Sequence, residues 1–461
     1  MATIPEIAGA IRTVLTTVAD AAARPTGFVK RVSKLTGPLF AQTGVFGWLN
    51  NPDASLDELC QVAAALGVEV TPQGLDQRFS PEAVDFMAEV LNGAVGQVLS
   101  AASPAAIPLL HRFTAVLLQD SSIIKLPEAL AAVWRGCGDS VGGHQAGLKI
   151  EVRLDVLNGT LSGPLLEEAR TQDKGSAIQA LPMPPGALRI ADLGYFSLDT
   201  MRETDAIGAF FLSRLQVQTG LFDDSSNRLD LLRLLEGSGR GQLEMVVRMG
   251  CTHRLPVRLL AVRVPQEVAD QRRRRMRDEA RRRGQPVSKE RLALADWTIL
   301  VTNVPQEMLS LEEALVLSRV RWQIELLFKL WKGHGKVDEW RSEKPWRILC
   351  EVYAKLTAMI VQHWLLLTNP WAYPTRSMVK AARTVRDHAL VLVFAMTQLA
   401  DLELAIRQVG RCLAAGCRMN PRRKAPNTYQ LLLQVAPDRH HWLSISVPNH
   451  CRQLANLKEA A

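Results

Sequence analysis

The segment Ser318–Lys332, which reads SRVRWQIELLFKLWK, carries charged and apolar residues at helical spacing. At 100° per residue, its charged and hydroxyl side chains fall within an arc of roughly 80°. This arc holds Ser318, Arg321, Glu325, Lys329 and Lys332. The other side is apolar and holds Val320, Ile324, Leu327, Phe328 and Trp331. The segment is therefore predicted to be an amphipathic helix with a buried back and one carboxylate in a stripe of cations.

Two interpretations fit this stripe. Charged helix faces are common, and Arg321–Glu325 and Glu325–Lys329 are favourable pairs for a solvated surface. Alternatively, the carboxylate holds a divalent cation and the cations hold phosphodiester oxygens. The rest of the chain has to distinguish the two.

The bulk composition is that of an ordinary globular protein with a basic excess. The 461 residues suffice for two or three domains and a large core. The 55 Lys and Arg residues outnumber the 46 Asp and Glu residues and leave a net charge of +9, which favours a polyanionic partner. The first residues show no secretory signal, and no apolar stretch is long enough to span a bilayer. We therefore expect a cytoplasmic protein without a membrane partner.

The seven cysteines are scattered, which is typical of reduced thiols in a cytoplasm. Cys412 and Cys417 have the spacing of half a zinc site, and Cys251 lies two residues from His253. No second half with ligand spacing follows, so no structural zinc is predicted.

Residues 1–105 are predicted to be helical. Ser55 is expected to cap a helix that ends at Gly67, and Thr71-Pro72 to open another. Helix, short turn and helix is the outline of a helix-turn-helix module, but any helical bundle has such corners. Lys30 and Arg31 supply positive charge nearby. DNA binding and plain bundle packing both remain open for this region.

A mixed α/β pattern begins near residue 110. The strand-like segments are Phe113–Leu118, Leu148–Leu157, Ala187–Ala191 and Ile207–Leu212. Asn158-Gly159 is a strong hairpin signal after the second of these. Pro164–Leu181 is predicted to be a helix, and Ser197 to cap another.

A very basic helix, QRRRRMRDEARRRG, is predicted to end at Gly284 within a region of strand-like pieces. Its arginines are expected either to be solvated or to contact a phosphate backbone. From about residue 341 onward the chain is predicted to be mainly helical, with a basic loop, CRMNPRRKAPN, before its end.

Three carboxylates stand out. Asp120 and Asp192 each follow a predicted strand, and Glu325 lies on the amphipathic helix. Side chains at strand ends of an α/β sheet converge on one site, and three acidic groups can hold two Mg²⁺ ions. A glycosidase-type pair would need only two carboxylates and no cationic stripe. Taken singly, each aspartate is also a common turn residue.

In order and context, these segments resemble the DDE transposases of bacterial insertion sequences, in particular the insertion sequence 4 family. That family carries a Tyr-x2-Arg-x3-Glu-x6-Lys signature. The matching residues here are Ser318, Arg321, Glu325 and Lys332. In that family the first Asp follows a strand and precedes Gly or Ser and then Ser or Thr, a pattern that LLQDSS around Asp120 matches. The second Asp follows a strand and begins the pattern Asp-x-Gly-Tyr, which ADLGY around Asp192 matches. The resemblance spans roughly residues 25 to 430.

The resemblance implies a ribonuclease-H-like mixed-sheet core in residues 106–370, with a β-rich insertion at about residues 216–304. It implies that the helical residues 1–105 bind the terminal inverted repeats of the element. The helical residues 371–461 would support a homodimer in the DNA complex. Double-stranded DNA, as repeat and as target, would be the partner, in the bacterial nucleoid.

The resemblance also implies roles for single residues. Asp120, Asp192 and Glu325 would be the catalytic metal ligands for two Mg²⁺ ions, with Mn²⁺ as a substitute. Water would attack one strand, and the freed 3′-hydroxyl would attack the other strand, giving a hairpin, and finally target DNA. The remaining DNA contacts would be Arg321, Lys332, Ser318, Arg214, Lys30 and Arg31.

Related enzymes flip a base near the hairpin and stack it on a tryptophan. Trp297 and Trp322 stand at the matching positions. The helical spacing places Trp322 at the edge of the charged stripe and Trp331 in the core. For Trp297, a position in a sheet core is the alternative.

Ser318 departs from the family's pattern, because serine keeps a hydroxyl but loses the reach of a tyrosine ring. A phosphate contact there is expected to be absent or bridged by water. An active cut-and-paste transposase is the prediction. The alternatives are a catalytically impaired DNA-binding protein derived from a transposase, and a metal-dependent nuclease with the same core.

Overall fold

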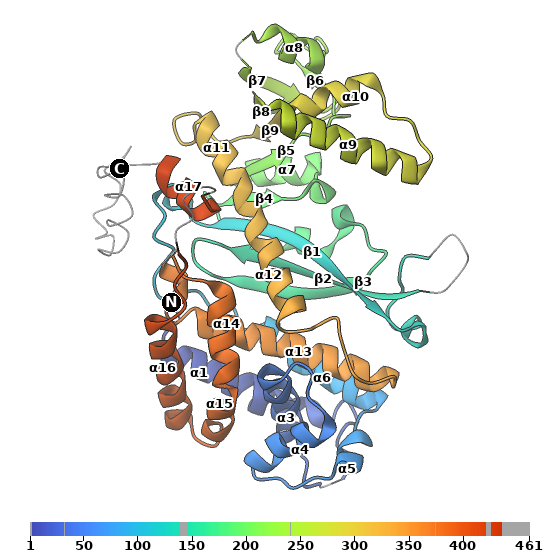
Figure 1. Cartoon of the computed structure of the whole chain (residues 1–461), viewed down its shortest axis with the longest axis vertical. Coiled ribbons are helices and arrows are strands. Elements are labelled where there is room, and N and C mark those ends of the chain that lie inside the picture. Colours follow the sequence, from blue (N-terminus) through green and yellow to red (C-terminus); the bar gives the residue numbers. More distant parts are fainter. Residues whose placement is uncertain are drawn as a thin grey trace.

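The computed structural model describes residues 2–31, 33–138, 145–239, 241–373, 375–420 and 426–435 of the chain. Part of the predicted C-terminal region, including residues 421–425 of the basic loop, lies outside the described residues. Figure 1 shows a sheet through the middle of the molecule with one helix, α12, lying across it. The N-terminal helices and α13–α16 gather at one end of the sheet, and α8–α10 gather at the other.

The strands form one nine-stranded sheet in the order β3-β2-β1-β4-β5-β9-β8-β7-β6. Strands β1, β4 and β5 are parallel to one another, and all other pairs are antiparallel. The first five strands are β1 (Val116–Leu126), β2 (Ala146–Asp155), β3 (Leu161–Glu168), β4 (Leu188–Ala191) and β5 (Phe210–Arg214). The last four are β6 (Leu221–Phe222), β7 (Gln242–Met249), β8 (Leu255–Arg263) and β9 (Trp297–Thr302). The strands of the predicted insertion therefore extend the same sheet.

The predicted hairpin is present, but the helix predicted after it is not. Strands β2 and β3 pair through a turn in which Gly159 has φ +75°, a conformation that favours glycine. The prediction of a helix over Pro164–Leu181 is wrong. Its first residues continue β3 to Glu168, because they pair with β2, and short 3-10 turns follow. Pairing with a neighbouring strand thus overrides the local preference.

The N-terminal helices begin where their capping residues predict. Ser55 and Glu58 form a capping box at α4, and the Thr71 hydroxyl caps α5. These helices are α1 (Ile4–Arg12), α2 (Ala19–Ala23), α3 (Gly37–Asn50), α4 (Leu56–Ala65), α5 (Pro72–Asp76) and α6 (Pro81–Val95), with a π-helical turn over Thr13–Val18. Helices α3 and α6 pack on α13 (Pro345–Leu366), which is buried along most of its length.

The remaining helices lie around the sheet. Those in the middle of the chain are α7 (Leu198–Ala206), capped by Ser197 as predicted, α8 (Leu231–Gly237), α9 (Gln266–Arg283) and α10 (Lys289–Ala293). Those at the end are α14 (Met378–Asp387), α15 (Ala389–Ala395), α16 (Leu399–Ala415) and α17 (Thr428–Val435). Within the described residues, no helix is long and apolar enough to cross a bilayer.

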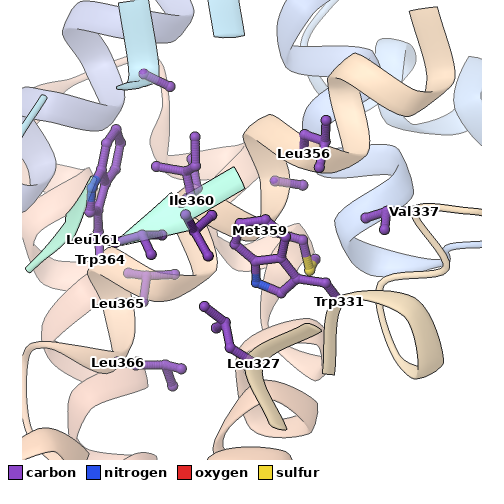
Figure 2. Close-up of a cluster of buried hydrophobic side chains, with 14 of the residues drawn as sticks. Leu161, Leu327, Trp331, Val337, Leu356, Met359, Ile360, Trp364, Leu365 and Leu366 are labelled. Atoms are coloured by element: carbon purple, nitrogen blue, oxygen red, sulfur yellow. The ribbon is translucent and has the colours of Figure 1, made fainter. Parts of the chain in front are cut away.

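The segment Ser318–Lys332 is not one continuous α-helix, because it begins with the last residue of α11 and passes through a 3-10 turn before α12. Helix α11 (Leu311–Ser318) ends where a 3-10 turn over Arg319–Arg321 begins, and α12 (Trp322–Gly333) follows. The apolar side of α12 is nevertheless buried as predicted: Ile324, Leu327, Phe328 and Trp331 are at most 9% exposed. Figure 2 shows Leu327 and Trp331 against Met359 and other side chains of α13.

The start of α11 is fixed by a buried ion pair. Arg112, which precedes β1, donates two hydrogen bonds to the Glu313 carboxylate, at 2.8 and 2.9 Å, and a third to the Met308 carbonyl at 2.7 Å. Burial works to raise the pKa of Glu313, but the bonds from Arg112 and from the Ser310 backbone hold it below its usual value. The pair therefore joins α11 to the segment that leads into β1.

We predict that Arg112→Met lowers the free energy of unfolding by about 3–5 kcal/mol, because it leaves the Glu313 carboxylate buried without its partner. The Glu313 side chain is only 4% exposed. Urea denaturation of the two proteins measures the difference. Arg283→Met removes a partner of the exposed Glu279 and is the control; an equal loss in both variants would contradict the prediction.

Candidate active site

Strand pairing places Asp120 beside Asp192. Strands β1 and β4 run parallel, with Gln119 aligned with Ala191, and the residue that follows each of these two is an aspartate. The expectation that Asp120 ends its strand is wrong. Strand β1 continues to Leu126 because it pairs with β2 over that length, whereas β4 ends at Ala191. Asp120 thus lies in mid-strand, at the point where the neighbouring strand stops.

Helix α12 brings the third carboxylate to the same place. The Arg321 guanidinium contacts all three acids: Nη2 lies 2.6 Å from Glu325 Oε1, and Nη1 lies 3.3 Å from Asp120 Oδ2 and 3.7 Å from Asp192 Oδ1. The Arg321–Glu325 pair expected for a solvated helix face is therefore present. It is, however, part of a four-residue cluster assembled from β1, the end of β4, and α12.

The cluster holds three carboxylates around one cation, which is electrostatically costly. Burial raises the pKa of Asp120 to about 6, and the nearby Asp192 and Glu325 charges act in the same direction. The Arg321 charge and the Ser121 backbone N–H, 2.9 Å from Asp120 Oδ1, offset part of this effect. One arginine does not neutralise the site, so it has room for more positive charge.

The oxygen donors suit a hard divalent cation such as Mg²⁺ or Mn²⁺. Among the described residues, no three acidic, histidine or cysteine side chains are arranged to share an ion as they stand. The three carboxylates converge instead on the Arg321 guanidinium. They fit a metal in donor type and charge, and binding one would need Arg321 to release part of its contacts.

The rest of the cationic stripe lies along the same helix. Lys332 Nζ donates to the Ile123 carbonyl of β1 at 2.8 Å, and Asp338 lies 3.7 Å away. Trp322 is 45% exposed, and Lys329 Nζ lies 4.2 Å from the centre of its ring. The Ser318 hydroxyl donates to the Leu315 carbonyl at 2.8 Å, so it is turned back on its own helix.

Trp297 lies at a second location, at the start of β9. It is 9% exposed and borders a cavity of about 460 Å³. Four arginines line this cavity, together with Leu193, the residue after Asp192. They are Arg214, Arg272, Arg275 and Arg291. A sheet tryptophan thus forms part of a basic cavity next to the turn that carries a candidate catalytic residue.

Lys30 and Arg31 are exposed and lie among the N-terminal helices, not beside the carboxylates. Lys30 pairs with Glu82 at 2.9 Å. Helix α5 is tied to the connection between α12 and α13, since Asp76 pairs with Lys344 and with Arg347. Part of the predicted helix-turn-helix corner is therefore used in packing.

Sequence reasoning missed the charged face of β2. Lys149, Glu151, Arg153 and Asp155 alternate along this strand, and all four are at most 4% exposed. Alternating charges normally mark a solvated face, but here the irregular segment after β3 binds Lys149 and Arg153, and the β2–β3 turn binds Asp155. Arg153, for example, donates to the Ile178 carbonyl at 2.7 Å and to the Leu181 carbonyl at 2.9 Å. The sequence did carry a signal for this face, namely four charged residues at every second position of the strand.

We predict that Asp120→Asn stabilises the metal-free protein at pH 8 but not at pH 4. Between about pH 4 and 6, Asp120 keeps its proton in the folded protein but has lost it in the unfolded chain. The free energy of unfolding therefore falls as the pH rises from 4, and the loss is complete once the pH has passed the folded pKa of about 6. A shift of this size corresponds to a difference on the order of 2–3 kcal/mol. Urea denaturation in a chelator at both pH values measures it, and an equal effect at both would count against the raised pKa.

Comparisons with known proteins agree with this geometry. The family model described as "Transposase DDE domain" matches residues 111–361, more than half of the chain. This match runs from the segment before β1 through α12 and most of α13, and so includes all three carboxylates.

The similar proteins are transposases. The chain is 28% identical to the transposase for insertion sequence element IS231B of Bacillus thuringiensis subsp. berliner, over 74% of this chain and 75% of that protein. It is 29% identical to the IS231C transposase of the same organism, over 74% and 75%. It is 23% identical to the transposase for IS1151 of Clostridium perfringens, over 75% and 77%. The chain belongs to the DDE transposase family.

Proposed function

We propose that this DDE transposase binds the terminal inverted repeats of its own insertion sequence and catalyses cut-and-paste excision and strand transfer. The convergence of Asp120, Asp192 and Glu325 on one guanidinium is the observation that carries the proposal. Strands far apart in sequence and one helix bring these carboxylates within reach of a single cationic group. Such an arrangement suits a reaction at a phosphodiester, where metal and phosphate meet.

Membership of the family implies dependence on a divalent metal. We infer that Asp120, Asp192 and Glu325 hold two Mg²⁺ ions, for which Mn²⁺ can substitute. Bound metal would activate the attacking oxygen and stabilise the leaving oxygen of an in-line displacement. The raised pKa of Asp120 supports this assignment, because added positive charge would relieve the repulsion among the acids.

The protein's own groups would orient the DNA through successive displacements. In the first, water attacks a phosphorus at the end of the element and the bond to the 3′-oxygen breaks, leaving a 3′-hydroxyl and a 5′-phosphate. That hydroxyl then attacks the opposite strand, giving a hairpin end, which water opens. The freed 3′-hydroxyl finally attacks target DNA. Arg321, in the turn before α12, and Lys332, in the last turn of α12, would hold the phosphates at the cleaved end.

We infer that the chain falls within the insertion sequence 4 group, with Ser318 in the place of its tyrosine. The bond from the Ser318 hydroxyl to the Leu315 carbonyl supports the view that this residue makes no direct phosphate contact.

The basic cavity beside Trp297 is our candidate for holding a flipped base. A base stacked there would be close to Arg214 and to the turn after Asp192. Trp322, exposed beside Lys329, is the second candidate, since it lies on the helix that carries Glu325.

We further propose that the core is ribonuclease-H-like and covers residues 106–370. The order β3-β2-β1-β4-β5, with three antiparallel strands followed by two parallel ones, supports this assignment. Residues 216–304 would be its insertion, and residues 1–105 would bind the inverted repeats with Lys30 and Arg31 among the contacts.

We also propose that the protein forms a homodimer on DNA. The C-terminal helices, within residues 371–461, expose apolar side chains on α15 and α16 that a second copy would cover. The most exposed are Phe394 at 64% and Leu404 at 59%. The reaction would take place in the cytoplasm, on DNA of the nucleoid.

We predict that purified protein with Mg²⁺ produces nicks and hairpins at the repeat boundary of a labelled duplex, and that Glu325→Gln reduces them at least about 100-fold. The carboxylate would contribute several kcal/mol through the bound metal. Glu312→Gln, an exposed glutamate on α11, is the matched control and should cut like the parent.

Two other results of this cleavage assay would contradict the proposed function. Binding at the boundary without cleavage by the parent protein would indicate a catalytically impaired DNA-binding protein. Cleavage without regard to the boundary would indicate a general nuclease.

Ser318→Tyr is predicted to raise the yield of hairpin ends roughly fivefold, the effect of one added hydrogen bond to a phosphate at about 1 kcal/mol. Ser318→Phe supplies the ring without the hydroxyl and should not produce the gain. Gel quantification of hairpins against nicks separates the two, and equal yields for parent and Ser318→Tyr would refute a role for this position.

A further inference from the structure

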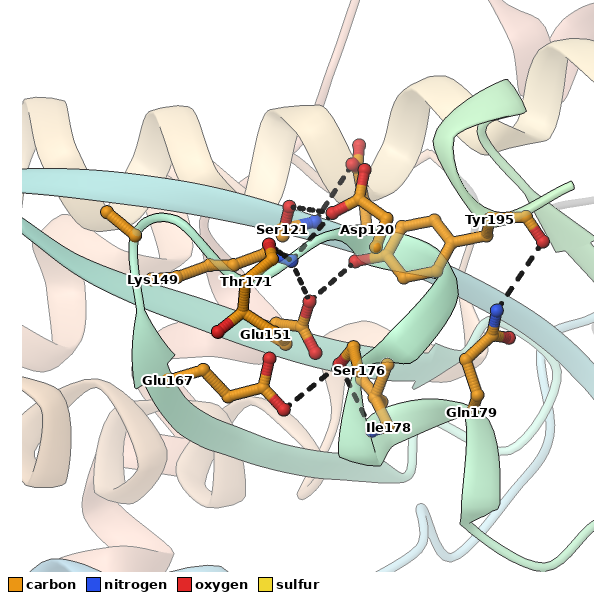
Figure 3. Close-up of polar contacts among 12 residues, drawn as sticks. Asp120, Ser121, Lys149, Glu151, Glu167, Thr171, Ser176, Ile178, Gln179 and Tyr195 are labelled. Atoms are coloured by element: carbon orange, nitrogen blue, oxygen red, sulfur yellow. Dashed lines mark hydrogen bonds and ion pairs between the residues drawn. The ribbon is translucent and has the colours of Figure 1, made fainter. Parts of the chain in front are cut away.

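A buried polar cluster lies beneath the carboxylates, on the other face of the sheet. We call it the Lys149 cluster; its members are Ser121, Lys149, Glu151, Asp173 and Tyr195. Figure 3 labels four of them: Ser121, Lys149, Glu151 and Tyr195. Successive residues of a strand point to opposite faces, so Asp120 faces α12 while Ser121 faces this cluster. Ser121 is aligned with Glu151 on β2, which places both side chains on the same face.

The ammonium of Lys149 is the centre of the cluster. Its Nζ lies 2.7 Å from Glu151 Oε1, 2.7 Å from Asp173 Oδ1 and 3.0 Å from the Thr171 carbonyl. Three donors thus meet three acceptors, which is what a buried ammonium requires. The Lys149 side chain is 3% exposed and that of Glu151 is 0% exposed. A charged pair this deeply buried costs desolvation energy, so stability alone is a weak reason for its presence.

The cluster contacts both segments that carry the candidate aspartates. From the Asp120 side, the Ser121 hydroxyl donates to Asp173 Oδ1 at 3.3 Å. From the Asp192 side, the Tyr195 hydroxyl donates to Glu151 Oε1 at 3.1 Å. Tyr195 is 1% exposed, and burial raises the pKa of its hydroxyl, which therefore keeps the proton that it donates.

Gly194 brings the Asp192 turn close to the same cluster. A Cβ at this position would lie too close to the Asp173 carboxylate, which would have to move to admit it. The turn over Leu193–Tyr195 is a single 3-10 turn with Asp192 directly before it. The bond of the Tyr195 hydroxyl and the contact at Gly194 hold the second half of the turn that follows Asp192.

We propose that the Lys149 cluster is a positioning device that fixes the spacing of Asp120 and Asp192, with Tyr195 as its tether. This inference rests on the proposed function, in that the two aspartates must bind metal. Groups that orient metal ligands change metal affinity by about 10–100-fold when they are removed. Tyr195 is a positioning residue, because it acts through the turn that carries Asp192.

The test compares two buried tyrosines. Tyr195→Phe removes the bond to Glu151, whereas Tyr353→Phe removes a bond from Trp134 Nε1 to the Tyr353 hydroxyl, 2.9 Å long, on α13. The full-length proteins are mixed with a duplex that carries the inverted repeats flanking the gene. Free Mn²⁺ is then measured by electron paramagnetic resonance during a titration. We expect the Mn²⁺ dissociation constant to rise about tenfold for Tyr195→Phe and not for Tyr353→Phe.

The cleavage assay on the same samples should show a parallel shift in the Mn²⁺ concentration for half-maximal rate, with the rate restored at high Mn²⁺. A merely structural role would change the melting temperature of both variants and leave the metal titration unchanged. Should Tyr195→Phe fail to fold, Ser121→Ala, which removes the bond to Asp173, is expected to weaken Mn²⁺ binding in the same direction.

The outcomes separate this inference from the function on which it rests. Boundary cleavage by the parent, with equal Mn²⁺ affinity in parent, Tyr195→Phe and Ser121→Ala, would overturn the positioning role alone. A Glu325→Gln protein that binds Mn²⁺ and cuts like the parent would overturn the metal-ligand assignment, and the positioning role with it.

Discussion

Burial of one face of α12 is the constraint on which the candidate site depends. Ile324, Phe328 and Trp331 are nearly inaccessible to solvent, and each contributes roughly 1.5–3 kcal/mol by leaving water. A helix held by one face has its other face fixed as well, so Arg321 and Glu325 are turned toward β1 and the end of β4. Because this apolar face is docked, Glu325 shares the Arg321 guanidinium with Asp120 and Asp192.

Polar contacts fix both ends of the same unit. At the start, Arg112 binds Glu313 on α11. At the end, the buried Lys355 of α13 donates to the carbonyls of Lys336 and Glu339, in the loop that follows α12. The hydrophobic contact sets which face of the helix is buried, and these bonds limit its sliding along the sheet.

The basic helix α9 divides its charges between structure and surface. Arg272 donates to the Trp297 carbonyl at 2.9 Å and to the Thr298 hydroxyl at 2.9 Å, and Arg273 pairs with Asp270 and Asp296. Other arginines of this helix are exposed: Arg274, Arg275, Arg277, Arg281, Arg282 and Arg283. Neither interpretation of its sequence covers the inward arginines, which hold the helix to β9. The outward arginines are exposed, and two of them, Arg281 and Arg283, pair with acids of the same helix.

The sequence by itself determined the elements whose signals are local. Ser55 and Thr71 cap their helices, Asn158-Gly159 turns a hairpin, and the apolar face of α12 follows from its spacing, because each depends on neighbouring residues alone. The three carboxylates were also identified in the sequence, from their contexts and the family resemblance. Their roles as metal ligands, like those of the other site residues, remain a prediction.

Tertiary structure decided what depends on distant partners. Pairing with β2 made a strand of the first residues of Pro164–Leu181 and carried β1 past Asp120. The segment after β3 and the β2–β3 turn supply partners for the buried charges of β2, which periodicity alone would have assigned to solvent. Only the folded chain brings Arg321 among three acids and Tyr195 against Glu151, since such contacts join residues whose order in the sequence carries no information about their distance.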